Sequence, residues 1–122
     1  MAITSYKDLE VWQVAISLAE ECYRLSASFP KEETYGMTSQ IGRASVSVPA
    51  NIAEGYGRDQ TGSYIQFLRI AQGSARELET HLILVGRLKI ANTDALLPVQ
   101  DLCDRVGRML RALIRSLESR TQ

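Results

Sequence analysis

The sequence predicts an all-α protein, an antiparallel up-down-up-down four-helix bundle that forms one domain over residues 1–122. Four segments carry apolar residues at spacings of three and four, the periodicity of a helix with one buried face. No segment alternates apolar and polar residues with a period of two, as a strand does. The length suffices for one shared core but not for two, and short connections between helices favour the up-down topology.

The first predicted helix starts near Asp8 and ends near Ser28. Asp8 and Glu10 suit the positive end of the helix dipole, and Pro30 restricts Phe29 to extended geometry beyond the other end. The apolar residues that we expect to face the core are Leu9, Trp12, Ile16, Ala19 and Tyr23.

The second segment has helical spacing that is interrupted by Pro49. Its expected core residues are Met37, Ile41, Ala44 and Val48. Two alternatives are two short helices or one helix kinked at Pro49, since a proline inside a helix crowds the Ser45 carbonyl and costs about 3 kcal/mol. We favour the kink, because the hydroxyls of Ser45 and Ser47 could help to satisfy that carbonyl. Gly55 and Gly57 are the stop signals.

The third segment has the most regular pattern, a strict alternation of four and three that is typical of a coiled-coil seam. Its seam residues are Tyr64, Leu68, Ala71, Ala75, Leu78, Leu82 and Val85. With Gly73 and Ser74 beside them, the two alanines form a waist of small side chains, where we expect another helix to approach closely. Asn92 and Thr93 mark the next turn, and we expect Thr93 or Asp94 to cap the fourth helix.

The fourth segment combines an apolar face with a row of arginines. We expect the core to receive Leu102, Val106, Met109, Leu113 and Leu117. The opposite side carries Arg105, Arg108, Arg111 and Arg115. Residues 105–120 hold five basic side chains against one acidic side chain, Glu118, although the whole chain balances 14 basic with 14 acidic residues. Such a face either contacts phosphates or is the solvated outside of a bundle helix; without an aromatic platform, nucleic-acid binding would rest on shape or charge.

The sequence contains no arrangement typical of an active site, so we expect no enzyme, no cofactor and no metal. The single histidine, His81, is four residues from Glu77, whereas a bundle metal site needs Glu-x-x-His motifs from two helices. A hydrolase that uses Glu54 or Glu77 would need both carboxylates in a pocket beside His81. We expect these carboxylates and Glu79 instead to form ion pairs with Arg43, Arg69 or Arg76.

Other features point to a protein of the reducing cytoplasm. Cys22 and Cys103 lie among apolar residues without a metal or redox motif, so we expect two small core side chains. No apolar run approaches the roughly 20 residues that span a bilayer, and the first residues lack the order of a signal peptide. We therefore expect no membrane association.

Blocks of residues along nearly the whole chain match a known pattern. They are Tyr6–Leu9, Val11–Gln13, Phe29-Pro30, Tyr35-Gly36, Gln40-Ile41, the distinctive stretch Ser47–Gly55, Gly57-Arg58, Phe67-Leu68, Ile70-Ala71, Gly73-Ser74 and Glu77–Glu79. On these residues the chain resembles the four-helix proteins encoded within intervening sequences of bacterial 23S ribosomal RNA. One departure is Gly42 before Arg43, because the family commonly has two adjacent basic residues there.

The resemblance implies a four-helix bundle whose second helix passes through Pro49, and it implies a homopentamer. Similar proteins include the accessory subunit of diversity-generating retroelements, which associates with a reverse transcriptase and nucleic acid through a basic surface. The resemblance implies no catalytic site. We expect structural or interface roles for Trp12, Tyr35, Pro49, Asn51, Glu54 and Glu77.

Two functions follow as hypotheses. The first is a non-enzymatic, homo-oligomeric module that associates with RNA, DNA or a ribonucleoprotein through a basic surface. The residues expected to contact nucleic acid are Arg105, Arg108, Arg111, Arg115, Arg43 and Arg58. The alternative is a protein-interaction scaffold that docks a partner enzyme without touching nucleic acid.

Overall fold

The computed structural model describes residues 2–120, and these residues form helices and connections without a strand. The four long helices are α1 (Glu10–Ser26), α2 (Met37–Tyr56), α3 (Thr61–Arg87) and α4 (Thr93–Arg120). Short 3-10 turns, η1 (Tyr6–Asp8) and η2 (Lys31–Glu33), precede α1 and α2. The all-α four-helix prediction is confirmed.

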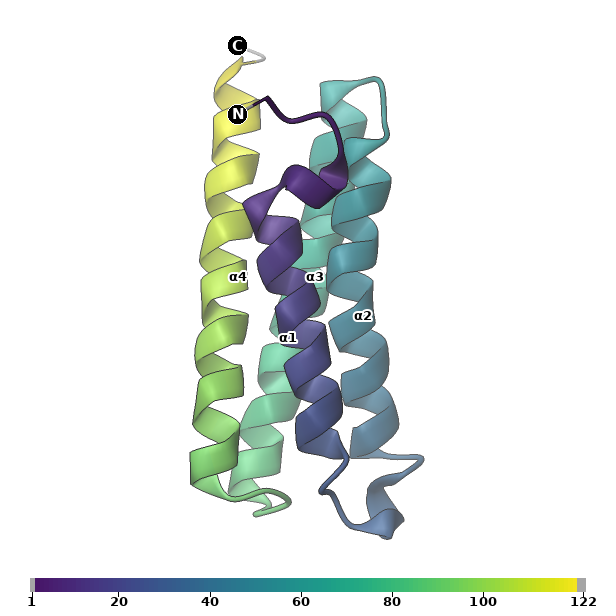
Figure 1. The fold of residues 1–122 in the computed structure, drawn as a ribbon, viewed down its shortest axis with the longest axis vertical. Coiled ribbons are helices and arrows are strands. Elements are labelled where there is room, and N and C mark those ends of the chain that lie inside the picture. The colour runs from purple at the N-terminus through teal and green to yellow at the C-terminus, as the bar shows by residue number, and fades with distance from the viewer. Residues whose placement is uncertain (1, 121–122) are drawn as a thin grey trace.

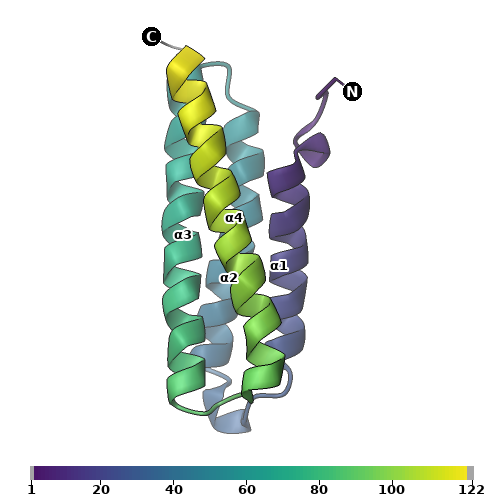
Figure 2. The ribbon, with the colours of Figure 1, turned by 90° about the vertical axis from the view of Figure 1, so that its left-hand side faces the viewer.

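The helices stand side by side, and each runs opposite to the one before it along the chain (Figure 1). Backbone contacts join α1 to α2, α2 to α3, α3 to α4 and α4 to α1, and neither diagonal pair has such contacts within residues 2–120. Seen from a second side, α4 lies in front between α1 and α3 (Figure 2). The start of α1 and the end of α4 therefore lie at the same end of a four-cornered bundle.

Helix α3 follows its predicted seam. Its buried side chains are Leu68, Ala71, Ala75, Leu78, Leu82 and Val85. Tyr64, the first residue of the predicted seam, is half-buried and packs against the core.

The predicted stripe of α1 is wrong, because the core is lined by the neighbouring stripe. The buried residues of α1 are Val11, Val14, Ala15, Leu18, Cys22 and Leu25. Of the predicted stripe, Leu9 and Trp12 are half-buried and pack against the core, Ile16 and Ala19 are half-buried on the flank, and Tyr23 is 58% exposed. The apolar residues of α1 form two adjacent stripes with the same periodicity, so spacing does not distinguish the inner stripe from the outer one. The helix also ends at Ser26, two residues before the predicted end.

The stripe predicted for α4 is displaced in the same way. The buried residues of α4 are Leu96, Val99, Cys103, Val106, Leu110, Ile114 and Leu117. Only Val106 and Leu117 belong to both sets, whereas Leu102, Met109 and Leu113 are half-buried at the edge of the core. The predicted cap of α4 is wrong as well. The side chain of Asn92, rather than Thr93 or Asp94, accepts a hydrogen bond from the backbone N–H of Ala95 at 2.8 Å.

Helix α2 continues through Pro49, which is buried inside it. The alternative of two short helices is therefore wrong, while the kink stays a prediction. The expected role of the two serines is also wrong. The Ser45 hydroxyl donates to the Gly42 carbonyl at 3.1 Å, and the Ser47 hydroxyl lies 2.8 Å from the Ser74 hydroxyl, so neither is directed at the Ser45 carbonyl.

Helices α2 and α3 approach each other closely, as the waist of small side chains predicts. Ser47 and Ser74 form a hydroxyl pair across this seam. Farther along, a Cβ atom added to Gly55 would lie 2.7 Å from the Cβ of Phe67 and 3.2 Å from the carbonyl oxygen of Tyr64. Backbones at this separation tolerate only glycine at position 55.

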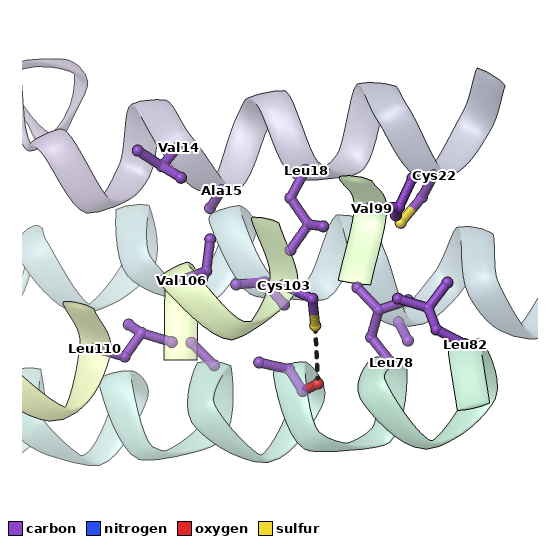
Figure 3. Packing of buried hydrophobic residues seen from close by; sticks show 14 of the residues in the cluster. Val14, Ala15, Leu18, Cys22, Leu78, Leu82, Val99, Cys103, Val106 and Leu110 are labelled. Carbon is purple, nitrogen blue, oxygen red and sulfur yellow. Dashed lines mark hydrogen bonds between the residues drawn. The ribbon is translucent and has the colours of Figure 1, made fainter. Parts of the chain in front are cut away.

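Cys22 and Cys103 are free, buried thiols, as expected (Figure 3). The Cys103 thiol donates a hydrogen bond to the carbonyl of Ala75 at 3.5 Å, which links α4 to α3. Burial raises the pKa of each thiol to about 12. None of the described helices has an apolar stretch of the length needed to cross a bilayer.

Candidate nucleic-acid interface

The four arginines predicted on α4 are all exposed, but they divide into two groups. Arg105 points towards α1, where its guanidinium donates to Glu10 at 3.2 Å. Arg108 pairs with Asp104 one turn earlier in its own helix. Arg111 and Arg115 form no ion pair with any residue of the described range 2–120. Of these four arginines, the two without an ion-pair partner therefore both lie in the second half of α4.

Helix α3 adds two arginines to this side of the bundle. Arg69 pairs with Glu118 of α4, which ties the outer surfaces of α3 and α4 together. Arg76, two turns later, lines a hollow with Arg108 and Arg111 of α4 and has no ion-pair partner in the part of the chain that the structure describes. The sequence predicts an ion pair between Arg76 and a carboxylate and does not place Arg76 beside the arginines of α4. Its position directly after the seam residue Ala75 is the signal that could have placed it there.

The hollow between α3 and α4 has a volume of about 170 Å³. The residues that line it are Gln72, Ala75, Arg76 and Glu79 of α3 and Cys103, Asp104, Gly107, Arg108 and Arg111 of α4. Three guanidinium groups thus face two carboxylates, and Arg108 with Asp104 is the one pair at contact distance among them. Gly107 adds no side chain to this lining, and a Cβ atom there would meet no other atom within 4 Å.

Arg43 and Arg58, the other two predicted nucleic-acid contacts, do not join this group. Arg43 of α2 pairs with Glu77 of α3 at 3.2 Å. Arg58, just after α2, pairs with Glu54 at 3.1 Å and lies over the Phe67 ring, 4.6 Å from its centroid. Helix α2 has no backbone contact with α4 within the described residues. A role of these two arginines in nucleic-acid binding stays a prediction.

The expected ion pairs of the semi-apolar carboxylates are found in part. Glu77 pairs with Arg43, as predicted. Glu54 pairs with Arg58 instead, and Arg69 pairs with Glu118.

His81 has Glu77 as its neighbour, with 3.2 Å between the histidine Nε2 and the glutamate Oε2. Its Nδ1 is buried and has no hydrogen-bond partner among the described residues. Glu54, the other carboxylate considered for a hydrolase, is held by Arg58 next to the end of α2. The arrangement connects Arg43, Glu77 and His81 across the α2–α3 surface, and no described hydroxyl or thiol is hydrogen-bonded to this histidine.

The remaining predicted structural residues differ in their contacts. The Trp12 ring lies edge-on to Tyr6, with 5.2 Å between centroids, and packs against the core. Asn51 donates to the Ser47 carbonyl at 2.8 Å and so extends the hydroxyl pair of the α2–α3 seam. Tyr35 is 95% exposed in the connection before α2. Its predicted interface role is untested by contacts within one chain.

The fold and this surface define a class, small all-helical bundles with an arginine-rich outer face on two adjacent helices. Residues 7–112 match the family described as 23S rRNA-intervening sequence protein, and the chain belongs to this family. The fold is also similar to that of a protein of unknown function from the S23 ribosomal protein family of Bacteroides thetaiotaomicron, known from a crystal structure. That similarity has a TM-score of 0.80 at 24% sequence identity and covers 85% of this chain and 97% of the other. A comparison with curated protein sequences gave no match.

Proposed function

We propose that the protein is a non-enzymatic, cytoplasmic, homo-oligomeric module that associates with RNA, DNA or a ribonucleoprotein. The contact is the arginine surface, defined as Arg76 of α3 with Arg108, Arg111 and Arg115 of α4. The observation that carries the proposal is the lack of ion-pair partners for Arg76, Arg111 and Arg115 within residues 2–120. The charge of an arginine without a carboxylate partner is not neutralised by a neighbour. Its paired N–H donors are therefore available to bind a phosphate.

Binding of short RNA and duplex DNA across a salt series tests this proposal. Replacement of Arg111 and Arg115 by Gln is expected to weaken binding about tenfold and to lower the salt-dependence slope by about two, one for each lost phosphate contact. The matched control replaces Arg24 and Lys31 by Gln, because this changes the net charge equally and both residues lie outside α3 and α4, in α1 and η2. Absence of binding at low salt, or equal effects of the two double variants, would contradict the proposal.

Self-association into a pentamer is the second part of the proposal, and its support is the resemblance and a partly exposed apolar strip. The strip consists of Ile16, Ala19 and Tyr23 on α1, and these residues line a shallow surface hollow. Exposed apolar surface of this kind favours contact with another protein surface. Light scattering of the full chain is expected to give about five times the mass of one chain. The mass of a single chain would exclude the ring.

The alternative function, a scaffold for a partner enzyme, is favoured by a different observation. Leu84, Leu88 and Leu97 are exposed near the α3–α4 connection, at the end of the bundle away from Arg115. Affinity capture with and without nuclease separates the two functions. A partner that stays bound after nuclease treatment favours the scaffold, and a partner that is lost favours the nucleic-acid module.

A further inference from the structure

We propose that the hollow between α3 and α4 is a phosphate-binding site. Arg76 from one helix and Arg108 and Arg111 from the other surround one phosphate group, which is either a phosphodiester of a nucleic-acid backbone or a free phosphate ion. This inference rests on the proposed function and deepens it, since it assigns one specific phosphate contact to the arginine surface.

Convergence from two helices is the first argument for this site. Arg108 and Arg111 are three residues apart, so they are neighbours on the surface of α4. Arg76 reaches the same hollow from α3, and Gln72, one turn before it, adds an amide donor. Guanidinium groups that approach one point from both sides can donate to several oxygens of a tetrahedral anion.

The balance of charge in the hollow is the second argument. Arg76 and Arg111 face the same space without ion-pair partners in the described chain, so each raises the electrostatic energy of the other. Arg108 pairs with Asp104, whose carboxylate also lines the hollow. A bound dianion or phosphodiester relieves the repulsion between the unpaired guanidinium groups. Glu79 and Asp104, the two carboxylates that line the hollow, reduce the charge of its three arginines to a net of one positive charge. Asp104 fixes Arg108, and each carboxylate excludes phosphate from its own edge of the hollow.

The shape of the hollow is the third argument. Gly107 lines the hollow between the levels of Cys103 and Arg108 on α4 without a side chain, and a Cβ atom there would meet no other atom within 4 Å. Ala75 and Cys103 form an uncharged, buried floor. Next to such a low-dielectric floor, ion–ion attraction is stronger than at a fully solvated surface.

The experiment introduces one carboxylate inside the hollow and the same carboxylate outside it. Gly107→Glu places a carboxylate in the hollow, and Gly62→Glu is the matched control in the first turn of α3, since Gly62 does not line the hollow. A Cβ atom at either position meets nothing within 4 Å, so both variants are expected to fold, which circular dichroism checks. Net charge changes equally in the two proteins. The probes are inorganic phosphate, followed by side-chain NMR shifts of the arginine Nε groups, and a short single-stranded oligonucleotide, followed by fluorescence anisotropy.

We expect Gly107→Glu to weaken oligonucleotide binding at least about tenfold and to abolish the phosphate-induced shifts, as loss of charge-assisted hydrogen bonds predicts. Gly62→Glu is expected to weaken binding by less than about threefold, because exposed charges outside the site are screened. Arg76→Gln, which leaves α4 unchanged, is expected to weaken phosphate binding as well.

The outcomes separate this inference from the proposed function. Equal weakening by the two glutamate variants would leave nucleic-acid binding intact as a function but overturn the phosphate site. Phosphate binding that depends on Gly107, without binding of any oligonucleotide, would support the site and overturn the nucleic-acid role. A wild-type protein that binds neither probe would overturn both.

Discussion

Helix α3 takes part in two seams of opposite character. Towards α2, the backbones are so close that Gly55 has no room for a methyl group, and a serine pair crosses the contact. Towards α4, Gly107 faces open space and three arginines surround a hollow. Gly55 thus permits close contact between α2 and α3, whereas Gly107 contributes no side chain to the space between α3 and α4. The comparison indicates that the α2–α3 seam is closely packed, whereas the α3–α4 seam contains a hollow that is lined by charged side chains.

The largest expected effect comes from exchanging the two glycines for alanine. Gly55→Ala forces its new methyl group against Phe67 and the Tyr64 carbonyl, so we expect a loss of about 2 kcal/mol in the free energy of unfolding. Gly107→Ala meets no atom and is expected to gain up to about 1 kcal/mol from better helix propensity. Urea unfolding measures both, and similar values for the two variants would remove the contrast between the seams.

The thiol of Cys103 tests how tightly the floor of the α3–α4 seam is closed. Burial, with the charges of Glu79 and Asp104, raises its pKa from near 9 to about 12. The thiol is therefore protonated in the folded protein at pH values where the unfolded chain is ionised. Its contribution to stability is fully present below pH 9 and is lost as the pH rises towards 12, at about 1.4 kcal/mol per pH unit.

The measurement uses unfolding free energies of Cys22→Ala and of Cys22→Ala/Cys103→Ala at several pH values between 8 and 11. The difference between the slopes of the two proteins isolates Cys103 from other groups that titrate in this range. A slope difference near zero, together with rapid reaction of Cys103 with a thiol reagent, would mean that the α3–α4 seam opens readily.

The smallest effects compare one polar link across each seam. Ser74→Ala removes the hydroxyl partner of Ser47 in a half-buried contact, and we expect it to cost about 1 kcal/mol. Arg69→Gln removes an exposed ion pair with Glu118 and is expected to change stability by less than about 0.5 kcal/mol. Thermal unfolding at low and high salt measures both changes. A larger cost for Arg69→Gln would show that the α3–α4 seam depends on its surface charges.

The number of apolar stripes on each helix explains how much of the fold could be predicted. In α3 one stripe continues without a break from Leu68 to Val85, and the exposed apolar residues beside it, Ile70, Ile83 and Leu84, form no second stripe of that length, so its spacing alone identified the buried face. In α1, two adjacent stripes have the same spacing, and α4 has half-buried residues beside its core stripe. Which stripe is buried depends on the rotation of each helix against its neighbours. That rotation is a property of the whole bundle rather than of one segment.

Of the candidate site, only the residues that α4 contributes could be predicted from the sequence. The run of arginines from Arg105 to Arg115 is visible in the sequence because its residues lie on one helix. Arg76 lies beside Arg108 and Arg111 because of the way in which α3 packs against α4. Arg105 does not belong to the candidate site, because it forms an ion pair with Glu10 of α1. Both changes result from contacts between residues that are far apart along the chain, where helical spacing carries no information.

The even number of helices has a further consequence for the order of the chain. The start of α1 and the end of α4 share one end of the bundle, and their backbone contacts make α1 and α4 neighbours in space although they are the most distant helices along the chain (Figure 1). A short linker between these two ends, with a new opening in the α3–α4 connection near Asn92, would preserve every helix contact in a circularly permuted protein. The hollow between α3 and α4 would then be formed by the last and the first helix of the chain.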